Sequence, residues 1–198
     1  MSWETNWLEH HTPWDAGDAS PTLKELVKSG TLPEGRALVP GCGSGYDVFE
    51  LASEKRRAIG LEVAPTAKKI FEAKRLERNL PSEQASVIVH DFFSFHSESP
   101  FDLIWDYTFL CAIQPEQRQA WAKKMKELLS PKGELITLLF PVTSGPKDQG
   151  PPFPLDPELI KTLLSSYFQV SLLEPVEHSH PARVGKEWLG RWTPKTTR

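Results

Sequence analysis

The sequence has little of what marks exported, membrane-spanning or nucleic-acid-binding proteins. Its 198 residues include only two cysteines, Cys42 and Cys111, which favours a reduced, cytoplasmic protein over a disulfide framework. No apolar run approaches the roughly 20 residues that cross a bilayer, and the first residues do not resemble a signal peptide. The net charge of −3 argues against the basic surface that nucleic acid requires. We therefore expect no membrane or nucleic-acid partner, and a monomer, since no long exposed apolar seam is visible.

Tryptophan and proline, in contrast, are abundant, with seven and 18 residues. Trp3, Trp7 and Trp14 crowd the start, in a polar segment that predicts a short helix or turn followed by coil. Prolines and glycines interrupt residues 141–157. A loop of this length is usually functional or disordered, and this one follows the carboxyl end of a strand, where open α/β sheets bind ligands.

The rest of the chain alternates between strand and helix patterns. Strands are predicted at 36–40, 57–63, 85–90, 101–107 and 134–140, and near 168–173 and 188–192. Helices are predicted at 22–29, 47–53, 65–79 and 115–129, and around 159–164. This alternation predicts a doubly wound parallel α/β sheet in a single domain spanning residues 1–198.

The strongest chemical signal is the segment VPGCGSGYD, residues 39–47, which leaves a strand and enters a helix. Gly41 and Gly43 let the backbone turn tightly and approach a ligand closely. Glu62 closes the next strand, where an acid accepts hydrogen bonds from a ribose diol. The spacing is G-x-G-x-G rather than G-x-G-x-x-G, which favours a nucleoside without a pyrophosphate, such as S-adenosylmethionine. The alternative is a structural turn with a surface glutamate.

Two further strands end in side chains suited to the same ligand. Asp91 and Phe92 follow the third strand, where an acid can accept from the adenine amino group while a ring packs on the base. Tyr107 follows the fourth strand, beside the expected sulfonium. Strand ends that supply polar groups at one edge are typical of a site at the topological switch point. The structural alternatives are a loop cap for Asp91 and a buried core phenol for Tyr107.

Several segments together resemble the thiopurine S-methyltransferase family. They are the three N-terminal tryptophans with Pro13 and Asp15, the LVPGCGSGYD loop, the FDLIWDY strand, the CAIQPEQR-AWA helix, and the GPPF and GKEWLGRW segments. Within the family, the sequence is closer to the thiol and halide (thiocyanate) methyltransferases of plants and fungi. Thiopurine methyltransferases proper carry an arginine where this chain has Tyr107, which favours the substrates of the plant branch.

The resemblance implies a Rossmann-like class I methyltransferase with a seven-stranded, mostly parallel sheet, helices on both faces, and S-adenosyl-L-methionine as cofactor. It also implies an N-terminal cofactor lid in residues 1–30, and we expect residues 141–157 to form a substrate-side loop. The cofactor contacts that it implies are Trp3, Trp7, Trp14, Gly41, Glu62, Asp91, Phe92 and Tyr107, to which the glycine loop itself adds Gly43.

Methyl transfer from a sulfonium needs little chemistry from the protein beyond orientation and exclusion of water. A thiol with a pKa of about 8.5 is partly ionised at neutral pH, and thiocyanate or halide ions need no base. Aromatic rings suit the sulfonium charge. Tyr107 is the candidate catalytic residue, because its hydroxyl could meet the nucleophile or assist its deprotonation.

The function expected is therefore methyl transfer to a small thiol, bisulfide, thiocyanate or halide. The alternatives are a bulkier thiol, dithiol or other small metabolite as acceptor, and a protein that binds the cofactor without catalysis. Arg183 and Lys186 could attract an anionic acceptor, although charges at such places more often form a solvated face. The histidine pairs at 10–11 and at 178 and 180 lack the further ligands that a metal site requires, so no metal is expected.

Overall fold

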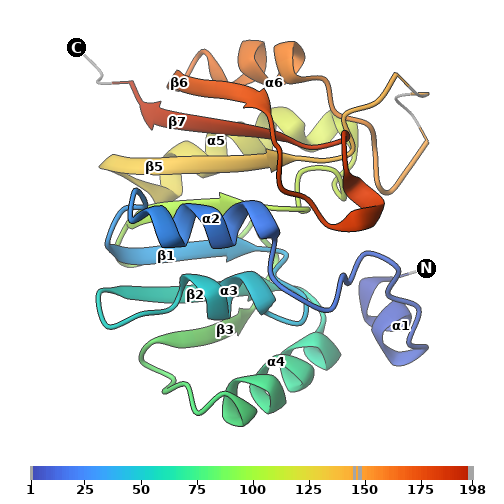
Figure 1. Cartoon of the computed structure of the whole chain (residues 1–198), viewed down its shortest axis with the longest axis vertical. Helices are drawn as coiled ribbons and strands as arrows, with labels where there is room; N and C mark the ends of the chain where they lie inside the picture. The colour runs from blue at the N-terminus through green and yellow to red at the C-terminus, as the bar shows by residue number, and fades with distance from the viewer. Residues whose placement is uncertain (1, 145, 147–148, 196–198) are drawn as a thin grey trace.

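The computed structural model describes residues 2–144, 146 and 149–195 (Figure 1). Within them, seven strands form one sheet in the order β3-β2-β1-β4-β5-β7-β6. The strands are β1 (Gly35–Pro40), β2 (Arg56–Glu62), β3 (Ala85–Val89), β4 (Phe101–Asp106), β5 (Leu129–Leu139), β6 (Phe168–Pro175) and β7 (Trp188–Pro194). Strand β7 is antiparallel to both of its neighbours, and the other pairs are parallel. The predicted seven-stranded, mostly parallel sheet is confirmed.

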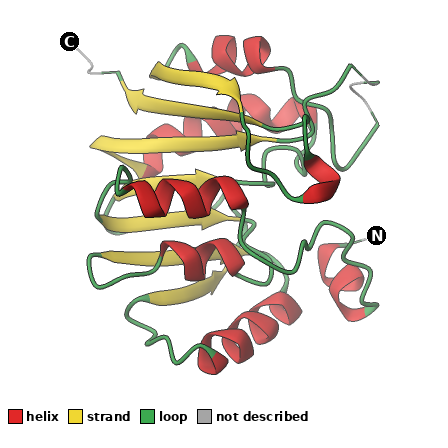
Figure 2. Cartoon of the chain, viewed as in Figure 1, coloured by secondary structure: helices red, strands yellow, loops and turns green. Residues whose placement is uncertain are grey.

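Helices cover both faces of this sheet (Figures 1 and 2). They are α1 (Trp3–Leu8), α2 (Pro21–Ser29), α3 (Tyr46–Leu51), α4 (Pro65–Glu77), α5 (Arg118–Leu128) and α6 (Pro157–Leu164), with 3-10 turns η1 (Pro115–Gln117) and η2 (Pro181–Arg183). Side chains of successive strand residues point to opposite faces. Val39 accordingly packs in the cluster with α2, α3 and α4, whereas Leu38 packs in the cluster with α5 and α6.

The boundary between α5 and β5 differs most from the sequence prediction. Strand β5 begins at Leu129, well before residue 134, because Leu129 pairs with Phe101 of β4 ahead of a register shift. The chain approaches β4 closely there: a Cβ on Gly133 would lie 2.9 Å from the Phe101 carbonyl oxygen. The predicted helix at 115–129 is therefore shorter, as a 3-10 turn followed by α5.

The carboxyl ends of the parallel strands β1 to β5 all lie at one edge of the sheet. Figure 1 shows α1 at this same edge, and the segment with η2 reaches it as well, because Arg183 contacts the Trp14 carbonyl. The β2–β3 register pairs Glu62 with Val89, and the β1–β2 register pairs Pro40 with Leu61. The glycine loop, Glu62 and the segment after β3 are thereby brought together. No helix within the described ranges is long and apolar enough to cross a membrane.

Candidate active site

The glycine loop between β1 and α3 needs glycine at its turning points. Gly41, Gly43 and Gly45 have φ values of 57°, 52° and 87°, in the left-handed region that other residues rarely adopt. A Cβ on Gly41 would also lie 2.7 Å from the ring of Phe109. The backbone of this loop is therefore free to face a ligand directly.

Glu62 joins the end of β2 to this loop. Its Oε2 accepts the N–H of Gly43 at 3.0 Å, and its Oε1 accepts those of Val63 and Ala64 at 2.8 and 3.0 Å. Burial raises the pKa of Glu62, and these three N–H groups counter the rise by stabilising the charged form. A carboxylate has about four acceptor positions, so one remains for a ligand.

Asp91 and Phe92 come to the same place from β3. Asp91 caps its own loop, because its Oδ1 accepts the N–H groups of Phe93 and Ser94, both at 3.0 Å. Its Oδ2 has no hydrogen-bond partner within the described part of the chain, so the carboxylate can cap the loop and still face a ligand. The ring of Phe92 is buried and packs 4.8 Å from the ring of Phe109.

The three N-terminal tryptophans gather over the glycine loop. Trp14 makes edge-on ring contacts with Trp3 at 5.1 Å and with Trp7 at 5.9 Å. Trp7 is 4% exposed, packs with Ala64, and would contact a Cβ on Gly43 at 3.4 Å. The tryptophans therefore pack against the core and also surround the site, so packing and ligand contact are compatible roles for them.

Polar contacts fasten this N-terminal segment. The Ser44 hydroxyl donates to Asp15 Oδ2 at 2.5 Å, which ties the segment to the glycine loop. In α4, the backbone N–H and the hydroxyl of Thr66 donate to the Glu4 carboxylate at 3.0 and 2.6 Å. The segment is thus attached at both sides of the site.

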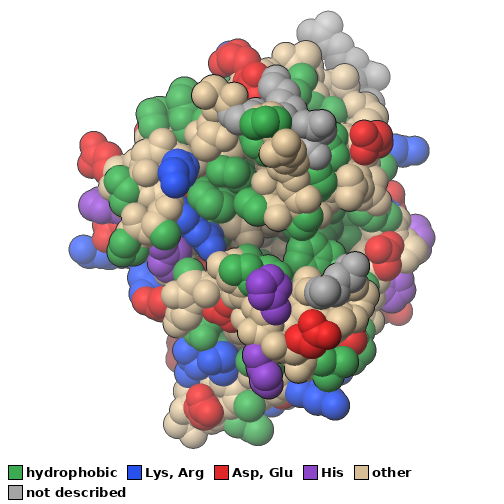
Figure 3. Space-filling view, turned by 90° about the vertical axis from the view of Figure 1, so that its right-hand side faces the viewer, with side chains coloured by type: hydrophobic (Ala, Val, Ile, Leu, Met, Phe, Trp, Pro, Cys, Tyr) green, Lys and Arg blue, Asp and Glu red, His purple; other side chains and the backbone are tan. Residues whose placement is uncertain are grey.

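Beneath it lies a cavity of about 750 Å³, within the range of ligand pockets. Figure 3, which looks onto this edge, shows hydrophobic side chains gathered around a depression. The cavity is lined by nearly all of the residues expected from the sequence: Trp3, Trp7, Trp14, Gly41, Gly43, Glu62, Asp91 and Phe92. Tyr107 is not among its lining residues; it lines a smaller space of about 70 Å³ that shares Gly41, Gly43 and Arg183 with the cavity.

Arg183, which precedes β7, lines both spaces. Arg183 is only 9% exposed, so it does not belong to the solvated face that is usual for charges at such places. Lys186, in contrast, is exposed to solvent. Its Nη2 donates to the Trp14 carbonyl at 2.7 Å. The guanidinium carbon lies 5.0 Å from the ring centre of Tyr107 and 4.9 Å from that of Phe140. Arg183 is therefore a buried cation held between two aromatic rings.

The hydroxyl of Tyr107 is occupied on both sides. It accepts from Arg183 Nη1 at 2.5 Å and donates to Glu187 Oε1 in a short hydrogen bond. Burial raises the pKa of Tyr107 well above its usual value, and the charge of Glu187 adds to the rise. Both observations disfavour Tyr107 as a base and associate it with Arg183 instead.

Sequence reasoning missed three residues at this edge. Phe109 and Phe140 line the cavity, and their positions just beyond β4 and β5 could have suggested it. Glu187 had no such signal, because its contact with Tyr107 joins residues that are 80 positions apart.

A comparison with known proteins identifies the family. The family model for thiopurine S-methyltransferase matches residues 1–195. The chain belongs to the thiopurine S-methyltransferase family. Its members are enzymes, so the chain is a methyltransferase. This confirms the resemblance found in the sequence motifs.

Relatives within the family differ in their distance from this chain. Thiocyanate methyltransferase 1 of Arabidopsis thaliana is 45% identical over 96% of this chain and 83% of the relative. The probable thiol methyltransferase 2 of the same plant is 42% identical over 98% and 85%. Thiopurine S-methyltransferase of Vibrio campbellii is 27% identical over 96% and 93%. The greater similarity to the plant enzymes agrees with the prediction.

Solved structures support the fold at low sequence identity. A glycopeptide N-methyltransferase complexed with S-adenosyl-L-methionine matches with a TM-score of 0.71 and 16% identity, over 89% of this chain and 94% of that chain. Magnesium protoporphyrin IX methyltransferase from Synechocystis PCC 6803 matches with a TM-score of 0.68 and 16% identity, over 88% and 76%. The chain therefore has the class I methyltransferase fold.

Proposed function

We propose that this methyltransferase moves the methyl group of S-adenosyl-L-methionine to a small thiolate, bisulfide, thiocyanate or halide ion. The observation that carries the proposal is the composition of the 750 Å³ cavity, which has nucleoside-type contacts at one end and a single buried cation among apolar groups at the other. The names of the plant relatives, thiocyanate and thiol methyltransferase, support the same class of acceptor.

The residues around the glycine loop fit the cofactor. Glu62 keeps one acceptor position for a ribose hydroxyl, and Asp91 Oδ2 is available to the adenine amino group. The indole N–H groups of Trp7 and Trp14 have no hydrogen-bond partner within the ranges that the structure describes, which leaves them for the carboxylate of the cofactor. The rings of the tryptophans would also contribute cation–π attraction to a sulfonium.

The acceptor end combines Arg183 with apolar side chains, and Thr108, Gln114 and Gln117 also line the cavity. Phe109, Cys111, Phe140 and Pro151 line it, and such walls exclude water from a small nucleophile. Arg183 would attract an anion, and its contacts with Tyr107 and Trp14 fix its direction. A soft anion with little need of hydration suits this combination.

The cofactor supplies an activated methyl group on a charged sulfur. As the bond from the acceptor to the methyl carbon forms, the bond from carbon to sulfur breaks, and its electron pair remains on that sulfur. The protein aligns the two partners, excludes water and holds Arg183 beside the acceptor. A thiol loses its proton to solvent before attack, whereas thiocyanate and halide ions need no such step.

Two segments would control access. Residues 1–30 would act as a cofactor lid, because Glu4 and Asp15 fasten them across the cavity. Residues 141–157 would close the acceptor side, where Pro151 and Pro152 line the wall; positions 145, 147 and 148 lie outside the described residues. We further propose a single-domain, monomeric, cytoplasmic enzyme, in keeping with the unpaired thiols of Cys42 and Cys111.

The test is turnover of a panel of acceptors by the full chain with S-adenosyl-L-methionine. We expect methylated product with at least one of thiocyanate, iodide, bisulfide and a small alkyl thiol, and little with a bulky thiol. Binding of the cofactor without product from any small acceptor would overturn the proposal.

Variants of the two neighbouring cations sharpen this test. Arg183→Leu should raise the KM for thiocyanate about 10- to 100-fold, the range expected for losing contacts with a charged group. Lys186→Leu is the matched control, because Lys186 is exposed and lines neither space. Equal effects of the two substitutions would contradict the assignment of the acceptor site.

A further inference from the structure

Glu187 is a buried acid behind the acceptor site. It is 1% exposed, precedes β7, and lines neither of the two spaces. Its Oε1 accepts the hydroxyl of Tyr107, and the buried hydroxyl of Ser179 stabilises the same carboxylate from another side. A buried carboxylate is costly, so its retention here calls for a function.

We propose that Glu187 is a positioning residue for the acceptor site: through Tyr107, it orients the Arg183 guanidinium and offsets part of its charge. The proposal rests on the proposed function, in which Arg183 attracts the acceptor anion. Glu187 does not itself contact the acceptor. It acts through a chain of two hydrogen bonds, from Arg183 Nη1 to the Tyr107 oxygen and from the Tyr107 hydroxyl to Glu187.

The orientation follows from which groups donate. Because the Tyr107 hydroxyl gives its proton to Glu187, the lone pairs of its oxygen are left to accept from Arg183. Arg183 is then held by Tyr107 on one terminal nitrogen and by the Trp14 carbonyl on the other. Without an acceptor at position 187, the hydroxyl would be free to turn its proton elsewhere, and Arg183 would lose one of its two supports.

The charge offset matters because the nucleophile loses its negative charge during methyl transfer. A cation beside it therefore stabilises the bound anion more than the transition state. An uncompensated Arg183 would bind the anion tightly and slow its reaction. The negative charge of Glu187, on the far side of Tyr107, weakens the field of Arg183 at the acceptor while Arg183 stays beside the acceptor.

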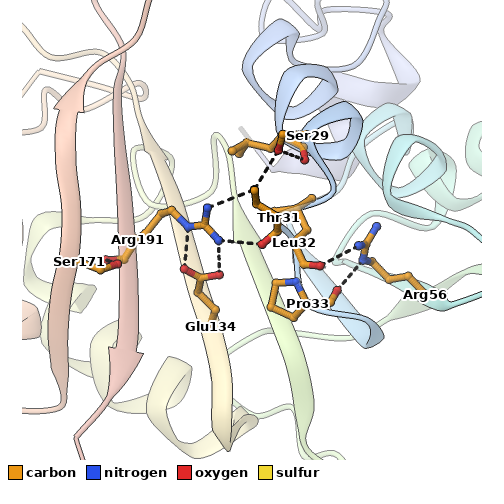
Figure 4. A network of polar contacts seen from close by, with 9 residues as sticks. Ser29, Thr31, Leu32, Pro33, Arg56, Glu134, Ser171 and Arg191 are labelled. Atoms are coloured by element: carbon orange, nitrogen blue, oxygen red, sulfur yellow. Dashed lines mark hydrogen bonds and ion pairs between the residues drawn. The ribbon is translucent and has the colours of Figure 1, made fainter.

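A second, partly buried pair shows a structural arrangement of an arginine and a glutamate in this fold. Arg191 of β7 contacts Glu134 of β5 directly, with Nε–Oε1 and Nη2–Oε2 distances of 2.7 Å (Figure 4). That pair lines neither space. Arg183 and Glu187, by contrast, meet only through Tyr107 within the described residues, and Arg183 keeps a side facing the cavity.

The decisive variant is Glu187→Gln, which retains an acceptor oxygen for Tyr107 and removes the charge. With thiocyanate, whose charge is constant with pH, we expect KM and kcat to fall together by about three- to tenfold, as expected for one partly shielded charge. The ratio kcat/KM should change much less. A purely structural role would leave KM unchanged or raise it, and that result would overturn the proposal.

Glu134→Gln is the control for the loss of a partly buried carboxylate that pairs with an arginine. It should lower stability and leave the KM for thiocyanate unchanged, since Glu134 is remote from both spaces. If Glu187→Gln does not fold, Glu187→Asp replaces it. The shorter side chain should loosen Tyr107 and raise KM more than it lowers kcat, and kinetics equal to those of the wild type would contradict the proposal.

A second readout needs no turnover. Tyr107 faces Arg183 and Glu187, while Asp47, His180 and Cys111 are the other titratable groups that the charge of Arg183 influences. Removing the charge of Glu187 should tighten the binding of thiocyanate to the protein saturated with S-adenosyl-L-homocysteine about three- to tenfold, as measured by calorimetry. Thiocyanate that binds the wild type and the Glu187→Gln variant equally would overturn the proposal, whereas thiocyanate that binds neither would overturn the proposed function instead.

Discussion

Glu62 shows how one residue can serve both the fold and the site. Its carboxylate holds the glycine loop through Gly43 and the start of the next segment through Val63 and Ala64. Burial opposes the charge, and the N–H groups from two chain segments support it. The loop and the acid are therefore one unit, and neither keeps its geometry without the other.

Replacing Glu62 should affect ligand binding and stability together. For Glu62→Ala we expect S-adenosyl-L-homocysteine to bind more weakly by about 1–3 kcal/mol, because a charged acceptor is lost and buried N–H groups lose their partner. Calorimetry of the variant against Glu83→Ala, an exposed control, measures this. Equal affinity in the two variants would remove Glu62 from the site.

Tyr107 gives a second prediction at this scale. Tyr107→Phe retains the ring beside Arg183 and removes the oxygen to which Arg183 donates. The KM for an anionic acceptor should rise about tenfold, as expected for the loss of a hydrogen bond to a charged group. The affinity for S-adenosyl-L-homocysteine should change little. A variant whose cofactor affinity falls as much as its acceptor affinity would instead indicate that the hydroxyl supports the whole site.

At the scale of elements, the Glu4 carboxylate of α1 caps the amino-terminal end of α4. Helix α4 begins at Pro65 after Ala64, which has no side chain to cap it. Glu4 of α1 accepts the backbone N–H of Thr66 instead, and a negative charge there is favourable. These hydrogen bonds lower the pKa of Glu4. The stability that Glu4 adds by holding α1 against α4 is therefore fully present above the pKa of Glu4 in the unfolded chain. It is lost as pH falls through the lowered pKa of the folded protein.

Removing this contact should loosen the N-terminal segment. Glu4→Ala should make residues 1–20 more sensitive to limited proteolysis and weaken S-adenosyl-L-homocysteine binding about three- to tenfold, the modest effect expected of an exposed cap. Glu9→Ala is the matched control, because Glu9 is an exposed acid at the other end of α1. Unchanged proteolysis of the Glu4 variant would show that the tryptophans alone hold the segment.

At the scale of the whole molecule, a buried acid joins the central strand β4 to helix α5. Asp106 ends β4 and is 2% exposed. It accepts the N–H of Leu110 at 3.0 Å and the indole N–H of Trp121 in α5 at 2.8 Å. Burial raises the pKa of Asp106 to about 6. Its charge is thus tolerated because two buried donors face it.

The raised pKa sets a direction for stability. Below about pH 4, the pKa expected in the unfolded chain, Asp106 is protonated in both states and does not lower stability. As pH rises from there to about 6, the free energy of unfolding falls by up to about 3 kcal/mol, because the unfolded chain ionises more easily. Asp106→Asn removes this dependence but places an amide donor against one of the two N–H groups. The variant should have a much lower free energy of unfolding than the wild type at pH 4, as measured by denaturant unfolding. The difference between the two proteins should be smaller at pH 7. Parallel pH profiles would contradict the assignment.

The sheet and most of the pocket could be predicted from the sequence, because these depend on local patterns. Alternating apolar strands, glycines between a strand and a helix, and acids at strand ends recur at fixed spacing, so Gly41, Glu62 and Asp91 could be placed together in advance. The boundary of β5 could not, because a register shift against β4 sets it rather than any pattern in its own residues.

The acceptor end could be recognised only in the folded chain. From the sequence, Arg183 resembled a solvated charge and Tyr107 either a catalytic hydroxyl or a core phenol, because each was judged without the partner that it contacts. The fold brings them together from positions 76 residues apart, buries Arg183, partly buries Tyr107, and adds Glu187 behind them. Burial and hydrogen bonding between distant residues change the charge and orientation of a side chain, and no local spacing encodes them.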